Sequence, residues 1–144
     1  MSTAKTAADG AVGAQSLAIG IDVGGTKISA GVVSSTGRIL EQLCIPTADS
    51  GQELAQVLAG IVDQLRAAYS GVLAVGVGAA GLVEWPAGYI RWAPNNSYRH
   101  LPLQAQLADA TGLPTIVDND ANAAAWAEAH VRSEGGFSDL VYVT

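Results

Sequence analysis

Short apolar segments separated by turn-forming residues dominate the first third of the chain. The first segment, residues 17–23, is rich in Ile, Leu and Val and ends at two adjacent glycines. Residues 28–33 and 38–45 are further segments rich in apolar and β-branched residues, with a turn at 34–37 between them. Because turns this short join strands that are neighbours in a sheet, the pattern predicts a three-stranded antiparallel meander.

The next segment has the spacing of an amphipathic helix. Ser50 and Glu53 have the spacing of a capping box, and Gly71 marks the expected end of the helix. The fully apolar segment 72–77 follows, and we expect it to form a strand that pairs in parallel through the helical crossover. The apolar side chains of the helix recur three or four residues apart, at Leu54, Val57, Leu58, Ile61, Leu65 and Tyr69.

The second half of the chain alternates helices with strands after an irregular stretch. Residues 78–96 contain repeated Gly and Pro, which is the composition of loops and hairpins. The predicted elements that follow are a helix opened by Pro102 and stopped by Gly112, a strand at 115–117, an Ala-rich helix from Asn119 to about residue 131, and a strand at 140–143.

Composition and charge narrow the class of protein. Apolar residues make up 49% of the chain and charged residues 14%, a balance that favours a sheet covered by helices on both faces. No segment approaches the length of an apolar membrane span. The net charge is −6 and the seven basic residues are spread singly, which argues against nucleic acid as a partner.

Several residues and segments are assigned no chemistry. Residues 1–16 lack the features of a signal or transit peptide, so we expect a disordered leader and a cytoplasmic protein. Cys44 is the single cysteine, and we expect it to be inert and buried in a reducing compartment. The remaining candidates are interpreted as packing residues (Trp85, Trp92 and Trp126) or as surface or packing residues (His100 and His130).

A glycine-rich turn follows the first predicted strand, with the sequence Asp22-Val23-Gly24-Gly25-Thr26-Lys27. Adjacent glycines let a backbone approach a phosphate closely, and Thr26 adds a hydroxyl donor. Asp22 can hold a magnesium ion through water. The spacing is not that of a Walker phosphate loop. A simple glycine hairpin with an aspartate beside it explains the same residues, so the pattern alone leaves both interpretations open.

Residues 117–125 place polar side chains where a predicted strand passes directly into a helix. Asp120 would lie in the first helical turn, near the positive end of the helix dipole, with Asn119 and Asn122 on either side. In phosphoryl transfer a weak base such as aspartate is adequate, because the hydroxyl proton is accepted late in a loose transition state. Ordinary helix capping is the alternative, although three polar side chains exceed what capping requires.

Two small-residue segments form a third signal, Gly78-Ala79-Ala80-Gly81 and Ala93-Pro94-Asn95-Asn96. Small residues beside a strand end leave room for a ligand, and the Asn95 amide can bind a pair of sugar hydroxyls. A loop with ordinary turn-forming Pro and Asn residues is an equally good account of these segments.

Together these three signals resemble the motifs of the ROK family of sugar kinases and repressors. The resemblance covers residues 17–144 and keeps the order and spacing of the family's motifs. It implies an α/β lobe of the actin-like, ribonuclease-H-like ATPase fold, with a mixed five-stranded sheet and flanking helices. The order of the predicted elements is also typical of such a lobe.

The resemblance also implies a role for each motif. Asp120 would be the base that activates the 6-hydroxyl of the sugar, and many members carry Glu at the position of Asp118, a side chain that we expect to face away from the substrate. The sugar would be bound by Asn95, Asn119 and the backbone near Gly81. ATP and its magnesium ion would be bound by the first motif, Asp22, Gly24, Gly25, Thr26 and Lys27.

The implied function is ATP-dependent phosphorylation of a hexose, with glucose converted to glucose 6-phosphate as the expected reaction. ROK kinases are much longer than this chain. We therefore expect a leader at 1–16, an amino-terminal lobe at 17–134, and at 135–144 a linker with the first strand of a missing carboxyl-terminal lobe. That second lobe carries the family's zinc cluster, so no metal site is expected here beyond magnesium with ATP. The 144 residues alone should be inactive, and the parent is expected to be a homo-oligomer.

Two alternatives remain open. A ROK-type sugar-sensing repressor places a winged helix-turn-helix before the glycine motif, which residues 1–16 cannot form, and it has no need of the base Asp120. A sugar-binding module without catalysis is the other alternative.

Overall fold

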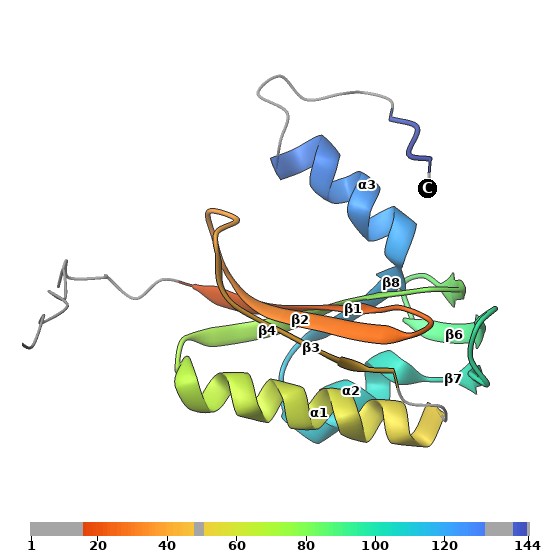
Figure 1. The fold of residues 1–144 in the computed structure, drawn as a ribbon, viewed down its shortest axis with the longest axis horizontal. Coiled ribbons are helices and arrows are strands. Elements are labelled where there is room, and N and C mark those ends of the chain that lie inside the picture. The colour runs from red at the N-terminus through yellow and green to blue at the C-terminus, as the bar shows by residue number, and fades with distance from the viewer. Residues whose placement is uncertain (1–15, 48–50, 132–139, 144) are drawn as a thin grey trace, which may run out of the picture.

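The computed structural model describes residues 16–47, 51–131 and 140–143. At its centre is a five-stranded sheet in the order β3-β2-β1-β4-β8 (Figure 1). β2 pairs antiparallel with both β1 and β3, whereas β4 pairs parallel with both β1 and β8. The expected mixed sheet is therefore confirmed. Its strands are β1 (Leu17–Val23), β2 (Lys27–Ser34), β3 (Ile39–Pro46), β4 (Val72–Ala79) and β8 (Thr115–Asn119).

Two helices cover one face of this sheet, and a third leaves from the opposite side. α1 (Gly51–Ala68) and α2 (Leu103–Thr111) lie below the sheet in Figure 1. α3 (Asp120–Val131) begins directly at the end of β8 and extends away above it. α2 ends where the sequence predicts, because Gly112 adopts a left-handed conformation with φ of 67° and donates its N–H to the Ala108 carbonyl.

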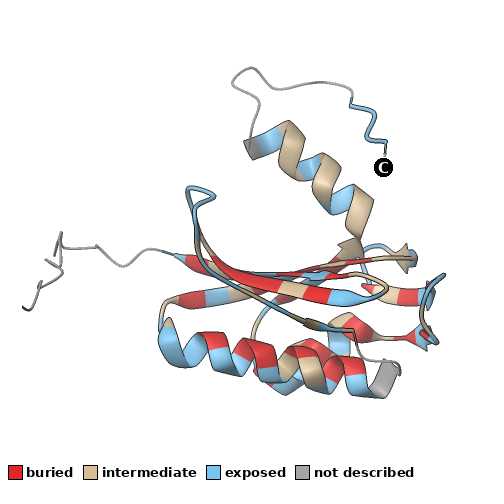
Figure 2. Cartoon of the chain, viewed as in Figure 1, coloured by how far each residue is buried: buried red, intermediate tan, exposed pale blue. Residues whose placement is uncertain are grey.

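The core lies between the sheet and the helices α1 and α2. Ile19 and Val23 of β1 are buried on this side, and Leu54, Leu58 and Leu65 of α1 are buried against them. Figure 2 shows the resulting layer of buried residues in red. Complete burial of one such side chain stabilises the fold by about 1.5–3 kcal/mol. This buried layer fixes the positions of β1, β4 and β8, and the loops at their carboxyl ends extend from it.

A second, antiparallel sheet is formed by β5 (Leu82–Glu84), β6 (Tyr89–Trp92) and β7 (Arg99–Leu101), in that order. The composition of residues 78–96 predicts only loop and hairpin structure in most of this region. Strands of three or four residues are too short to show an alternation of apolar and polar positions, so they leave little trace in the sequence. Ile90 and Tyr98 are buried and anchor this small sheet to the core.

Two expectations about packing are wrong. Cys44 is exposed, because it lies on the outward side of the edge strand β3, away from α1. The three tryptophans are also not packing residues, since the exposed fractions are 62% for Trp85, 46% for Trp92 and 61% for Trp126. The interpretation of His100 and His130 as surface residues is confirmed, as both are exposed.

Residues 140–143 do not form the predicted strand. All four are exposed and have no ladder partner among the described residues, and a strand without a partner is not stable in water. The leader expected at 1–16 falls on residues 1–15 except for its last residue, the linker expected from residue 135 falls on residues 135–139, and the proposed helix cap falls on Ser50. These lie outside the described residues. None of the helices within the described ranges combines the length and apolar character that a membrane crossing requires.

Candidate functional site

Two carboxylates approach each other at the carboxyl ends of parallel strands. Asp22 on β1 is in register with Gly78 on β4, and Gly78 is in register with Asp118 on β8. Asp120 follows on the first turn of α3, and a Cβ added at Gly78 would lie 3.4 Å from the Cα of Asp120. The missing side chain at Gly78 therefore makes room for Asp120 on the same side of the sheet as Asp22. Both carboxylates line a single cleft of about 1190 Å³.

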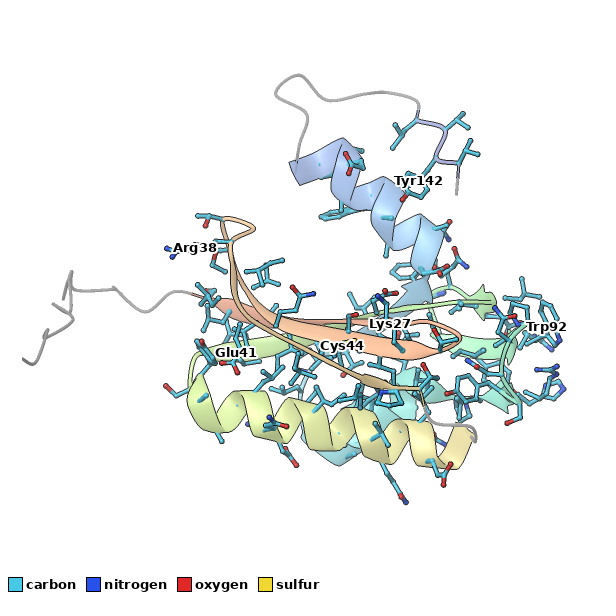
Figure 3. The ribbon with its side chains drawn as sticks, in the orientation of Figure 1. Lys27, Arg38, Glu41, Cys44, Trp92 and Tyr142 are labelled. Atoms are coloured by element: carbon cyan, nitrogen blue, oxygen red, sulfur yellow. The ribbon has the colours of Figure 1, made fainter. Side chains whose placement is uncertain are left out.

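The pKa of the Asp22 carboxyl is changed by its burial and by the charges beside it. Burial raises the pKa of Asp22, and the negative charge of Asp120 raises it further. The positive charge of Lys27 lowers this pKa and partly offsets both effects. Lys27 lies at the start of β2, where Figure 3 labels it. Since the two carboxylates repel each other, a cation between them would be stabilised. The strand ends thus form an acidic centre with one adjacent lysine.

The donor set at this centre fits a magnesium ion that keeps most of its own water. Magnesium in phosphoryl-transfer sites is held by one or two carboxylates together with water and phosphate oxygens. Asp22 and Asp120 can supply that number. No group of three or more Asp, Glu, His or Cys side chains arranged to hold a metal occurs among the described residues. The remaining ligands of such an ion would be water and the oxygens of a phosphorylated ligand.

Asn119 joins the start of α3 to the loop that follows β4. Its Oδ1 accepts hydrogen bonds from the backbone N–H groups of Ala121 at 3.0 Å and Asn122 at 3.2 Å, so the predicted helix cap is confirmed. Its Nδ2 donates to the Gly81 carbonyl at 2.9 Å. Three of the hydrogen-bonding positions of the amide are thus occupied. Among the described residues none accepts the second N–H of the Nδ2 group, so this N–H can donate to a ligand.

Asp118 holds a second asparagine in place. Its Oδ1 accepts hydrogen bonds from the Asn119 N–H at 2.7 Å and from Nδ2 of Asn122 at 3.2 Å. The Asp118 side chain lines the cleft, but its hydrogen bonds turn Oδ1 toward the beginning of α3. That it faces away from a bound substrate stays a prediction.

The glycine turn between β1 and β2 is closed by its own backbone and by Thr47, the residue that follows β3. The Gly24 N–H donates to the Lys27 carbonyl at 3.0 Å, which leaves the N–H groups of Gly25 and Thr26 as the candidates for binding a phosphate. Thr47 donates its hydroxyl to the Gly24 carbonyl at 2.9 Å and its N–H to the Thr26 carbonyl at 3.1 Å. Thr47 could not be predicted as a turn residue. Nothing in the local sequence shows that the chain at the end of β3 lies beside this turn.

The glycine turn is in direct contact with the loop that carries Asn95. A Cβ added at Gly25 would lie only 2.8 Å from the Cβ of Asn95, so only glycine permits this approach. Gly81 is equally restricted, with φ of 125° and no room for a side chain against Trp92 and Ala93. The structure thus brings the predicted phosphate turn and the predicted sugar loop together.

The predicted site residues fall into two adjoining groups. Asp22 and Asp120 line the large cleft together with Asp118 and Asn122, and its walls are mostly small or apolar. Gly25, Asn95 and Gly81 are not part of that lining and lie beside it, linked to it through Asn119. The residues of both groups could be predicted from the sequence. The contacts between the groups could not, because they join residues far apart in the chain.

Comparison with known proteins places these motifs in context. A family model described as "ROK family" matches residues 18–144. The chain is 39% identical over 128 residues to a glucokinase of Streptomyces coelicolor, covering 89% of this chain and 40% of that protein. It is 34% identical over 130 residues to an N-acetylmannosamine kinase of Escherichia fergusonii, covering 88% and 43%. The chain thus spans about two fifths of the length of these curated relatives.

A solved structure shows the same fold. It is a ROK family glucokinase from Streptomyces griseus in complex with glucose and AMPPNP, with a TM-score of 0.77 and 41% sequence identity. The match covers 83% of this chain and 38% of that one.

Proposed function

Because the chain belongs to the ROK family, we propose that it forms the amino-terminal lobe of a kinase that transfers the γ-phosphoryl group of ATP to a hexose. The observation that carries the proposal is the meeting of Asp22 and Asp120 at the ends of β1 and β8. The glycine turn and the Asn95 loop adjoin this pair. The relatives described above are named as sugar kinases, which supports the proposal.

Asp120 acts as the general base in this proposal. As the 6-hydroxyl oxygen of the hexose bonds to the γ-phosphorus of ATP, its proton passes to the Asp120 carboxylate and ADP leaves. Its place in the first turn of α3 fits this role, because the helix dipole favours a negative charge there. General base catalysis of this kind contributes about 10²–10⁴-fold to the rate.

The sugar lies between the Asn95 loop and the start of α3 in this proposal. Asn95 is exposed and its amide both donates and accepts, so it can bind two neighbouring hydroxyls. Asn119 has one N–H left, and it therefore donates to a hydroxyl oxygen. The Gly81 carbonyl, already engaged by Asn119, fixes the backbone beside the sugar.

The phosphates of ATP lie over the glycine turn. Gly25 and Thr26 offer backbone N–H groups, Thr26 a hydroxyl, and Lys27 a positive charge, while Gly24 keeps the turn closed. Asp22 would hold the magnesium ion of ATP through water, and that ion would neutralise charge on the transferring phosphoryl group. Lys27 and the turn position the nucleotide so that the γ-phosphorus faces Asp120.

The proposed substrate is glucose, and a sugar panel tests both the reaction and the choice of sugar. The full-length protein that carries this segment is incubated with ATP, magnesium and either glucose, mannose, fructose or N-acetylmannosamine. Release of ADP and the mass of the sugar phosphate are measured. We expect the highest kcat/KM with glucose. A higher value with another hexose would contradict the substrate, and no ADP release with any of them would contradict the kinase itself.

The 144-residue chain alone is expected to be inactive. A kinase of this kind closes two lobes around its substrates and excludes water from the phosphoryl group, and this chain carries only the turn, the base and part of the sugar pocket. Purified chain is assayed for glucose 6-phosphate after size-exclusion chromatography. Clear turnover by a monomer of this length would contradict the need for a second lobe.

A further inference from the structure

The loop that carries Asn95 is closed at its base by two buried residues. Ala93 and Tyr98 are 0% and 1% exposed, and the Ala93 N–H donates to the Tyr98 carbonyl at 3.3 Å. The residues between them project as a short loop from the small sheet, and Asn95 lies on Gly25. The position of Asn95 therefore depends on the shape of this loop.

A single arginine at the end of the loop contacts it at three points. Nη1 of Arg99 lies 3.0 Å from the Ala93 carbonyl oxygen, 3.0 Å from that of Asn96 and 2.7 Å from that of Tyr98. These carbonyls come from both ends and the middle of the loop, so their negative oxygens converge on one cationic group. Such charge-assisted hydrogen bonds are stronger than those between neutral groups.

The guanidinium of Arg99 is itself oriented by an aromatic ring. Its central carbon lies 5.4 Å from the ring centroid of Trp92, the last residue before the loop. Figure 3 labels Trp92 at the edge of the small sheet. The cation–π contact gives the exposed Trp92 ring a structural role, because the ring supports the arginine rather than the core.

We propose that Arg99 is a positioning residue for Asn95, and that it sets the affinity for the sugar without contacting it. The arginine donates hydrogen bonds to the three carbonyls and so fixes the shape of the loop. This shape keeps Asn95 packed against the glycine turn. This proposal rests on the proposed function, in which Asn95 binds sugar hydroxyls. Because the guanidinium of Arg99 contacts the carbonyls of this loop, its loss displaces Asn95 more than it disturbs Asp120 on α3.

Arg91 provides a matched control. It lies on β6, pairs with Glu84, and has its guanidinium 5.8 Å from the ring centroid of Tyr89. It is an exposed arginine on the same small sheet, next to an aromatic ring, but it makes none of the contacts to the Asn95 loop. Replacing it removes the same charge from the same region.

The test compares Arg99→Met, Arg99→Lys and Arg91→Met in the full-length protein. Glucose and ATP affinities are measured by calorimetry, kcat by the coupled assay, and Tm by thermal unfolding. We expect Arg99→Met to weaken glucose binding about tenfold, with kcat and ATP affinity within about twofold of wild type. Arg99→Lys keeps the charge but not the planar fork, so it should restore part of the loss.

Three outcomes would overturn the proposal. Glucose affinity within twofold of wild type in Arg99→Met is one, and an equal loss in Arg91→Met is another. The third is equal loss of glucose and ATP affinity together with a lowered Tm, which would indicate a general structural defect. If Arg99→Met does not fold, Arg99→Lys serves in its place, because lysine lacks the planar guanidinium. Unchanged glucose affinity in Arg99→Lys would then also contradict the proposal. Wild-type turnover of a hexose, measured alongside, separates failure of this proposal from failure of the proposed function.

Discussion

The two faces of the main sheet differ although they are built from the same strands. On the side of α1 and α2, β1 presents Ile19 and Val23, which are 0% and 1% exposed. On the opposite side the same strand presents Gly20 and Asp22, both of them exposed. Figure 2 shows the contrast between the buried layer and the open side that faces α3. The buried core lies on one face of the sheet, and the candidate site lies on the other.

The open face is shaped by glycines in register. Gly20 on β1 is paired with Gly31 on β2 and with Gly76 on β4, so three neighbouring strands carry no side chain at the same level. A Cβ added at Gly76 would meet nothing within 4 Å, which shows how open this side is. The contrast teaches that a strand can supply the core with one set of residues while the alternate set leaves space for a site.

The sharpest test of this division is Asp120→Asn in the full-length protein. The substitution keeps the size of the side chain but removes the base, so turnover should fall by about 10²–10⁴-fold while sugar binding and Tm change little. The coupled assay, calorimetry and thermal unfolding measure the three quantities. Asp109→Asn, an exposed aspartate on α2 of the covered side, is the control and should leave turnover unchanged. Turnover of Asp120→Asn within tenfold of wild type would be too high for a lost general base.

The second prediction compares the loss of one isoleucine side chain on each face of the main sheet, in the 144-residue chain. Ile19 is fully buried, so Ile19→Ala should lower the free energy of unfolding by about 2–5 kcal/mol through lost burial and the cavity left behind. Ile116 on β8 is 55% exposed on the open face, and Ile116→Ala should cost less than about 0.5 kcal/mol. Urea denaturation measures both. Equal losses would show that the open face also carries the stability of the chain.

A third prediction concerns the sugar side of the site. Asn95→Ala in the full-length protein should weaken glucose binding by about 1–3 kcal/mol, because a sugar hydroxyl loses its partner. ATP binding should change much less. Asn96→Ala, the next residue of the same loop, is the control, since only its backbone carbonyl contacts Arg99. Calorimetry measures the affinity for each ligand. Equal losses of glucose and ATP affinity would contradict a sugar-binding role for Asn95 and would indicate an ordinary turn residue.

The smallest effect is expected at Asp22 and depends on pH. Burial, followed by the charge of Asp120, raises the pKa of Asp22 in the folded chain, so the folded state binds more protons than the unfolded state between the ordinary and the raised pKa. Ionised Asp22 therefore destabilises the fold. This cost is absent below the ordinary aspartate pKa, grows as pH rises through that interval, and is constant above it.

Asp22→Asn should accordingly raise the Tm of the 144-residue chain at neutral pH but not at a pH below the ordinary aspartate range. Thermal unfolding across pH measures the difference. Asp63→Asn on the exposed side of α1 controls for loss of a negative charge alone. A gain in Tm for Asp22→Asn that is the same at every pH would contradict the raised pKa of Asp22.

Much of the fold could be predicted from local pattern. The meander of β1 to β3, the helix α1, the stop at Gly112 and the strand-to-helix junction at Asn119 all follow from periodicity or from a capping residue. The small sheet of β5, β6 and β7 could not be predicted, because each strand has only three or four residues. The exposure of Cys44 and of the three tryptophans was missed because residue type indicates burial only on average.

Local sequence pattern was enough to identify the candidate site residues. Asp120, Asn119 and the Gly24-Gly25 turn stand at ends of predicted elements, where local pattern suffices to identify them. Only the tertiary structure decided which of them meet: Asp22 with Asp120, Asn95 with Gly25, and Thr47 and Arg99 as their supports. Periodicity reports the neighbours of a residue along one strand or helix. The parallel order of β1, β4 and β8, which aligns their carboxyl ends, arises from contacts between residues far apart in the chain.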